Sequence, residues 1–123
     1  MPSLWKLSGR NHNFVRLAGL SGATAVIIGA IGSHSIPATM PEDKLDRKGI
    51  FETANRFHFF HSIALLGLPL ARQPMVTGLL MITGTMLFSG TLYYRAFTGK
   101  RVLGRLAPLG GTCLIAAWLS LLF

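Results

Sequence analysis

The first long apolar run of the chain reads LAGLSGATAVIIGAIGS (residues 17–33) and contains no charged side chain. Two further uncharged runs occupy residues 75–94 and 106–123. An α-helix needs about 17–25 mostly apolar residues to cross the hydrocarbon core of a bilayer, so each run is long enough. Only 13% of the 123 residues are charged, against about 25% in an ordinary soluble domain. The sequence therefore predicts an all-α integral membrane protein.

A fourth apolar segment, residues 57–71, is too short to span by itself and reaches span length only from about residue 50 or 51. That start brings several polar or charged residues into the helix: Glu52, Asn55, Arg56, His58 and His61. We therefore expect a four-helix membrane bundle in residues 14–123, following an interfacial tail of residues 1–13. The expected spans are residues 14–33, 51–70, 74–94 and 106–123. The short turn at residues 72–74 makes the second and third helices antiparallel neighbours.

Small residues recur on one face of the first helix. They are spaced alternately by four and three positions: Ala18, Gly22, Ala25, Gly29 and Gly32. Such a seam lets two membrane helices approach closely, and Gly84 and Gly90 suggest the same for the third helix. We interpret these seven residues as helix-packing positions, with a groove for ligand access as the alternative interpretation.

The net charge of +8 comes from twelve Lys and Arg residues, which gather at the ends of the expected spans. Because no basic stretch alternates with aromatic residues, we expect contact with anionic lipid and not with nucleic acid. The loop after the third helix carries the residues expected to meet lipid headgroups, for example those of cardiolipin: Arg95, Lys100, Arg101 and Arg105. Basic residues are more numerous beside the first and third loops, which predicts that both chain termini lie on the opposite side.

The most polar part of the second helix reads NRFHFFHS (residues 55–62). Asn55, His58 and Ser62 share one helical stripe, and His61 lies about 60° away around the helix. His34 closes the first helix and could reach the start of the second helix if the intervening loop folds back. Polar groups at membrane depth are costly, so they face the protein interior or serve a function. We therefore treat these five residues as a candidate polar cluster.

Three uses of the cluster remain open at this point. The histidines could be neutral and hydrogen-bonded to neighbouring helices, they could contact a lipid headgroup or a quinone, or they could ligate a metal or haem. The four acidic residues of the chain lie outside the deep parts of the spans, so a carboxylate-rich metal centre is not expected. A single cysteine, Cys113, excludes an intrachain disulfide. No catalytic set is recognisable, so we expect neither an enzyme nor a bound cofactor.

Several motifs, taken in order, resemble one family of small membrane proteins. They are AGLSGA (18–23), GAIGSH (29–34), FETAN (51–55), HFFHSIALLG (58–67), GTMLFSG (84–90) and LAPLGG (106–111). Together these motifs are similar to the transmembrane protein 256 family, whose members occur in bacteria and eukaryotes, and the resemblance covers residues 14–123. It implies four membrane helices and, for the eukaryotic branch, a mitochondrial location. It implies no reaction and no catalytic residues.

These observations favour a non-catalytic accessory or assembly subunit of a larger complex of the mitochondrial inner membrane, for example of the respiratory chain. The first sixteen residues are basic and free of acids, as in mitochondrial targeting regions. Both termini would then face the intermembrane space; in a bacterium the location would be the cytoplasmic membrane. The alternatives are a binding protein that uses His34, His58 and His61 for haem, a metal or a quinone-like ligand, and a small transporter.

Overall fold

The computed structural model describes residues 12–36, 47–99 and 105–123. The described residues form four α-helices: α2 (His12–Ser35), α3 (Arg47–Leu66), α4 (Pro74–Thr98) and α5 (Leu106–Ser120). A short 3-10 turn, η2 (Leu68–Leu70), joins α3 to α4. The tail predicted for residues 1–13 lies almost entirely outside the described residues. The all-α architecture expected from the sequence is confirmed.

Most helix ends differ from the expected spans by two to four residues; α3, for example, begins at Arg47 instead of residue 51. Two of these differences have an identifiable local reason. The second helix ends at Leu66 instead of residue 70, because the ring of Pro69 cannot continue an α-helix. The third helix continues four residues beyond the expected end at residue 94 and stops at Gly99. Gly99 adopts a left-handed conformation with φ of 74°, which ends helices at low cost only in glycine.

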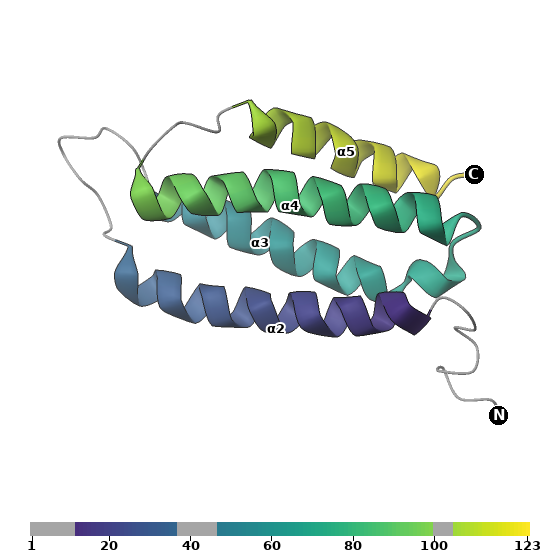
Figure 1. Cartoon of the computed structure of the whole chain (residues 1–123), viewed down its shortest axis with the longest axis horizontal. Helices are drawn as coiled ribbons and strands as arrows, with labels where there is room; N and C mark the ends of the chain where they lie inside the picture. Colours follow the sequence, from purple (N-terminus) through teal and green to yellow (C-terminus); the bar gives the residue numbers. More distant parts are fainter. Residues whose placement is uncertain (1–11, 37–46, 100–104) are drawn as a thin grey trace.

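The helices pack in chain order, as an open row instead of a closed ring. α3 packs against α2 and α4, while α5 packs chiefly against α4. Figure 1 shows α2, α4 and α5 in succession, with α3 behind α2 and α4. The start of α2, the α3–α4 turn and the end of α5 lie at the same end of the molecule. The face between α2 and α4 is therefore left open.

Glycines set the closest contacts between the helices. A methyl group added at Gly32 would lie 2.1 Å from Phe51 of α3, and one at Gly78 would lie 2.3 Å from Phe14 of α2. Between α4 and α5 the close contact is with backbone instead of a side chain: a methyl group at Gly110 would lie 2.5 Å from the backbone nitrogen of Phe88. Dispersion between closely packed helices is what holds membrane bundles together.

The outer surface is apolar, with many large side chains exposed on every helix, among them Leu20, Ile27, Ile63, Leu79 and Ile115. Among the described residues, two helices are long and apolar enough to cross a membrane by themselves: Asn13–Ser35 and Pro74–Thr98. α5 is apolar but shorter, and α3 carries charged residues at its start. The predicted count of four spans therefore stays a prediction.

Candidate functional site

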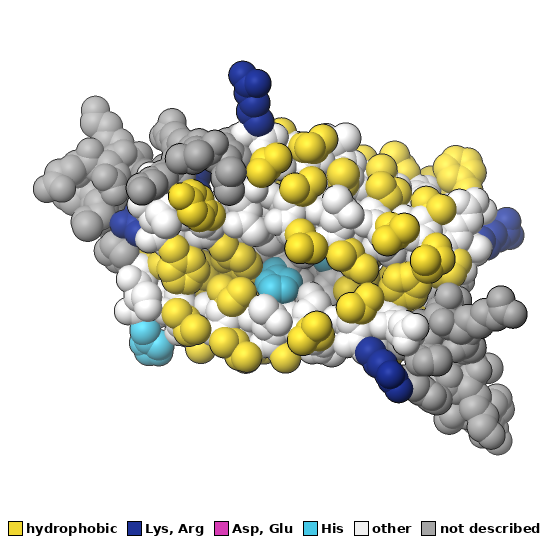
Figure 2. Space-filling view, viewed as in Figure 1, with side chains coloured by type: hydrophobic (Ala, Val, Ile, Leu, Met, Phe, Trp, Pro, Cys, Tyr) yellow, Lys and Arg dark blue, Asp and Glu magenta, His cyan; other side chains and the backbone are white. Residues whose placement is uncertain are grey.

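A pocket of about 440 Å³ lies between α2 and α4, with α3 at its base. Figure 2 shows the open face of the molecule, on which a histidine ring is visible in a hollow surrounded by apolar side chains. α2 contributes Leu17, Leu20, Ser21, Thr24 and Ile28 to the lining. α3 contributes His58, His61 and Leu65. α4 contributes Ile82, Thr85, Met86, Ser89, Gly90 and Tyr93.

The rim of this pocket is apolar and faces outward. Leu20 is 68% exposed and Met86 is 71% exposed. On a helix of a membrane protein such side chains face lipid tails, so the pocket opens sideways toward the bilayer. A molecule dissolved in the membrane could enter it without passing through water.

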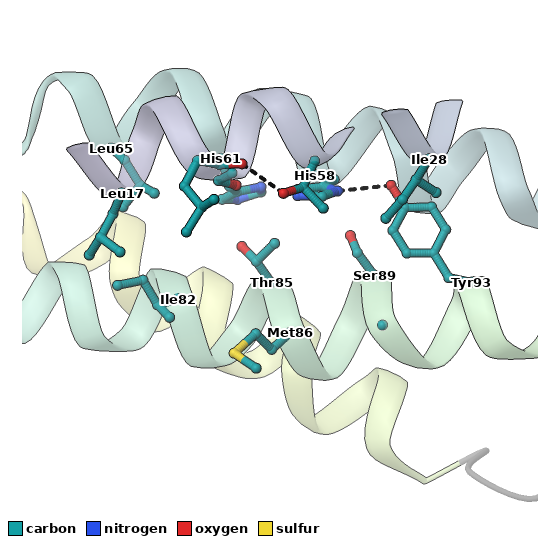
Figure 3. Close-up of a pocket in the computed structure, with 14 residues that line it drawn as sticks. Leu17, Ile28, His58, His61, Leu65, Ile82, Thr85, Met86, Ser89 and Tyr93 are labelled. Carbon is teal, nitrogen blue, oxygen red and sulfur yellow. Dashed lines mark hydrogen bonds between the residues drawn. The ribbon is translucent and has the colours of Figure 1, made fainter. Parts of the chain in front are cut away.

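A hydrogen-bond network at the base joins three helices. The Asn55 Nδ2 amide donates to the Ala25 carbonyl of α2 and to the Tyr93 hydroxyl of α4, each at 3.0 Å. The Tyr93 hydroxyl also lies 2.9 Å from His58 Nδ1, as the dashed line in Figure 3 shows. Gly29 leaves room for the amide, because a methyl group there would lie 3.1 Å from Asn55 Oδ1. Asn55 is therefore the residue that links α2, α3 and α4.

His58 has a partner on α4, because its Nδ1 lies 2.9 Å from the Tyr93 hydroxyl. Which of the two groups donates depends on the tautomer of the imidazole, since either nitrogen of the neutral ring can carry the proton.

His61 is fixed in one tautomer. Its Nε2 lies 3.1 Å from the Trp118 indole N–H of α5, which can only donate. Its Nδ1 therefore carries the proton and donates to the Phe57 carbonyl at 2.7 Å. Ligation of a metal or haem iron by His61 would therefore first break the bond to Trp118. Among the described residues no group of three or more His, Cys, Asp or Glu is placed to hold a metal ion.

The hydroxyl groups around the histidines are also paired, with one exception. Ser62 donates to the His58 carbonyl at 2.7 Å and meets the Ser21 hydroxyl at 2.5 Å. Ser89 donates to the Ala54 carbonyl at 2.8 Å, and Thr24 donates to the Leu20 carbonyl at 2.7 Å. Thr85 makes no hydrogen bond to any described residue. Figure 3 shows Thr85 and Ser89 pointing from α4 toward the two histidines of α3.

Four of the five residues of the candidate polar cluster come together: Asn55, His58, His61 and Ser62 lie on the buried side of α3. His34 does not join them, because it is exposed in the last turn of α2. At that end of α2, Gly32 packs on Phe51, which lies about 10 Å along α3 from His58 at 1.5 Å per residue. The end of α2 therefore lies beside the start of α3, but His34 stays apart from His58 and His61, so the structure does not bring the three histidines together.

The expected packing residues divide into two groups. Ala18 and Ala25 are buried, and Gly29, Gly32 and Gly84 lie against atoms of a neighbouring helix. Gly22 and Gly90 are different, since a methyl group at either would meet nothing within 4 Å. These two glycines therefore make no helix contact within the described chain, and Gly90 lines the pocket instead. Gly78 and Gly110, which also lie against neighbouring helices, were not among the residues expected from the sequence.

Of the four residues expected at lipid headgroups, Lys100 and Arg101 lie outside the described residues. Arg105 is exposed at the start of α5. Arg95 is only half-buried, and its buried Nε atom has no hydrogen-bond partner among the described residues. A basic residue that the sequence did not single out, Arg47, donates to the carbonyls of Ala96 and Phe97 at 2.8 and 2.6 Å. It thereby caps the carboxyl end of α4.

Comparison with known proteins identifies relatives of nearly the same length. A UPF0382 membrane protein of Staphylococcus epidermidis is 35% identical over 88% of this chain and 90% of its own. The UPF0382 membrane protein YwdK of Bacillus subtilis is 28% identical over 88% of this chain and 91% of its own. The UPF0382 inner membrane protein YgdD of Escherichia coli is 32% identical over 85% of this chain and 82% of its own. No solved structure matches the chain.

The family model described as a protein of unknown function (DUF423) matches residues 28–111. This region contains α3, α4 and most of the pocket. The resemblance inferred from the sequence motifs is confirmed, because transmembrane protein 256 is the eukaryotic member of the same family. The chain is accordingly a multi-pass membrane protein, and it belongs to the DUF423/UPF0382 family of small membrane proteins.

Proposed function

We propose that the protein is a non-catalytic accessory or assembly subunit that packs against a larger membrane complex. The observation that carries this proposal is that glycines of α2 and α4 leave two helix faces uncovered, called here the open glycine faces. At most helical glycines an added methyl group would meet a neighbouring helix, whereas methyl groups at Gly19, Gly22 and Gly90 would meet nothing within 4 Å. Glycine costs about 1 kcal/mol against alanine in a helix, and in membranes it is favoured where another helix approaches.

The finer assignment is a complex of the mitochondrial inner membrane, for example of the respiratory chain, or of the cytoplasmic membrane in a bacterium. The basic, acid-free first sixteen residues support a mitochondrial location. Anionic lipid such as cardiolipin would meet the basic residues at the start of α3, the end of α4 and the start of α5. The excess of basic residues on this side of the bundle supports an orientation with both termini on the opposite, intermembrane-space side.

Photo-crosslinking from the open glycine faces tests this proposal. A benzophenone side chain placed at position 22 or 90 should give adducts with a second membrane protein in native membranes. The matched control is position 115 on α5, where Ile115 is 62% exposed and carries a large side chain already. Adducts at all three positions with unrelated proteins, or no adduct at positions 22 and 90, would contradict the assignment.

A second function is favoured by the pocket. It is a membrane-embedded cavity with an apolar rim and a polar base, which is the usual form of a site for a small molecule. We propose as the alternative that the protein binds such a molecule there. Because both histidine rings are already hydrogen-bonded, the ligand would contact the hydroxyl groups of the pocket instead of being ligated by imidazole. The test is whether purified protein retains any membrane-soluble compound in lipid nanodiscs.

A further inference from the structure

The hydrogen-bonding protons of the pocket are almost all used by the protein itself. Ser62 donates to the His58 carbonyl, so Ser21 must supply the proton of the bond between the two serine hydroxyls. The protons of Thr24 and Ser89 go to the carbonyls of Leu20 and Ala54. The His61 imidazole donates to the Phe57 carbonyl. Most hydroxyl protons of the pocket are therefore used by the protein itself.

Acceptor capacity remains at the same groups. A hydroxyl oxygen that donates its single proton still carries two lone pairs. Ser21, Thr24 and Ser89 line the pocket from two sides, and each retains at least one lone pair after its known bonds. At membrane depth no water competes for these oxygens. A ligand that donates a hydrogen bond is therefore matched to this site.

Among the hydroxyl groups that line the pocket, that of Thr85 is the one without a partner in the described residues. Serines and threonines elsewhere in the described chain commonly bond to a carbonyl one helical turn back, as Thr53 and Thr112 do. Thr85 does not, although it lines the pocket and points toward His58 and His61 in Figure 3. An unpaired hydroxyl in apolar surroundings is costly. A bound hydroxyl group could satisfy Thr85 both as donor and as acceptor.

The charge of the lining restricts the ligand further. Among the described residues that line the pocket, none is Asp, Glu, Lys or Arg. A carboxylate, phosphate or ammonium group would enter without a counter-charge, at a cost of several kcal/mol in such surroundings. The pocket of about 440 Å³ lies in the range of sites for single small molecules. The ligand should therefore be neutral and mainly apolar.

We propose that this pocket binds a neutral, membrane-soluble alcohol or phenol, whose hydroxyl group donates to the free oxygen lone pairs at the base while its apolar body fills the space under Leu20 and Met86. This inference rests on the alternative function proposed above, that of a binding protein. It favours a hydroquinone over the oxidised quinone, because the quinone ring has acceptors only and cannot use these lone pairs, whereas the hydroquinone carries two donating hydroxyls.

A matched pair of probes tests the need for a donor. Farnesol and farnesyl methyl ether share the same chain and the same oxygen atom, but only the alcohol carries a proton to donate. Binding of each is measured to the full-length protein in phosphatidylcholine nanodiscs, against empty nanodiscs. Because one neutral hydrogen bond contributes about 0.5–1.5 kcal/mol, farnesol should bind roughly three- to tenfold more tightly than the ether.

A second pair, decylhydroquinone and decylbenzoquinone, distinguishes a phenol from an alcohol as the source of the hydroxyl. Tighter binding of the hydroquinone than of farnesol assigns the pocket to a phenol, and the reverse assigns it to an isoprenoid alcohol. Equal affinity within both pairs would overturn the donor rule while leaving the binding function in place. Retention of none of the four compounds would overturn the binding function as well.

The variant Thr85→Val tests whether the ligand hydroxyl is bound in this pocket. It keeps the shape of the side chain and removes the unpaired hydroxyl, so farnesol binding should weaken roughly threefold to tenfold. The control is Thr112→Val, which removes an exposed hydroxyl of α5 that bonds to the Pro108 carbonyl. Unchanged farnesol affinity in Thr85→Val, or equal weakening in both variants, would overturn the assignment.

Discussion

At the scale of single residues, Asn55 has more structural consequence than the histidines beside it. Its amide bonds to a carbonyl of α2 and to a hydroxyl of α4, so one side chain ties three helices together. The Ala25 carbonyl requires a donor, which fixes the orientation of the amide. The Tyr93 hydroxyl accepts from the same amide and lies 2.9 Å from His58 Nδ1. Asn55 therefore also helps to hold the hydroxyl group that His58 contacts.

Replacing Asn55 by leucine should destabilise the bundle by about 1–2 kcal/mol, because hydrogen bonds between membrane helices contribute about 0.6–1.7 kcal/mol each. Thermal unfolding of the purified protein in mild detergent measures this change as a lower Tm. Thr112→Val, which touches no other helix, is the control and should leave Tm unchanged. A variant Asn55→Leu as stable as the parent would show that the three-helix link has no energetic role.

The polar stripe shows which residue positions could be predicted from the sequence and which could not. Helical spacing alone was enough to place Asn55, His58 and Ser62 on one face of α3. Their partners Tyr93 and Trp118 could not be predicted, because these come from other helices whose rotation is set by packing. Tyr93 lies near the end of the third expected span, yet its hydroxyl reaches inward to His58. The packing of Gly32 on Phe51 places the end of α2, with His34, beside the start of α3 and away from His58.

At the scale of helices, glycine pairs determine how closely neighbouring helices approach. Gly84 of α4 and Gly110 of α5 face one another, and a methyl group at Gly110 would meet backbone atoms of α4 at 2.5–2.9 Å. Backbone atoms cannot rotate away as side chains do. The adjacent Gly111 lies in ordinary contact, with 3.7 Å between an added methyl group and the Phe88 ring.

This difference gives a matched prediction for the α4–α5 contact. Gly110→Ala should destabilise the bundle by about 1–3 kcal/mol, as overpacking of a close contact does. Gly111→Ala should be neutral or stabilising by up to about 1 kcal/mol, because alanine is the better helix former. Chemical denaturation in detergent compares the two variants. Equal stability of both would contradict the close α4–α5 approach.

The carboxyl end of α4 depends on a second helix. Arg47 of α3 donates to the carbonyls of Ala96 and Phe97, two of the groups that a helix leaves unpaired at its end. Arg47→Ala should therefore increase hydrogen exchange at residues 96–99 several-fold, by loss of about 1–2 kcal/mol of local stability. Lys48→Ala, at an exposed neighbour, should not. Unchanged exchange in Arg47→Ala would mean that Gly99 alone ends the helix.

Element boundaries followed from the sequence where local chemistry decides them. The three uncharged runs each became a helix, and Pro74 begins α4 as expected. The end of α4 was missed because Arg95 was taken to begin a loop, whereas Gly99 and the distant Arg47 determine where the helix stops. The end of α3 was missed because the apolar composition of residues 67–71 masked the effect of Pro69.

At the scale of the whole molecule, the open row of helices is the central feature. A closed bundle would bury α2 against α5 and leave no lateral pocket. Here a pocket lies between α2 and α4. Methyl groups at Gly22 of α2 and Gly90 of α4 would meet no described residue within 4 Å. The sequence predicted the small-residue seams but could not say whether they close the bundle on itself. The structure shows that Gly22 and Gly90 do not.

The central claim is that the protein works as part of a larger membrane assembly, and native separation tests it most directly. Membranes are solubilised gently, resolved on a native gel and searched for this chain by mass spectrometry. The chain is expected to migrate with a large complex, and Gly22→Leu, whose Cβ would meet nothing within 4 Å in the described bundle, is expected to release it. Migration of the unaltered chain as a small free species in several mild detergents would contradict the account.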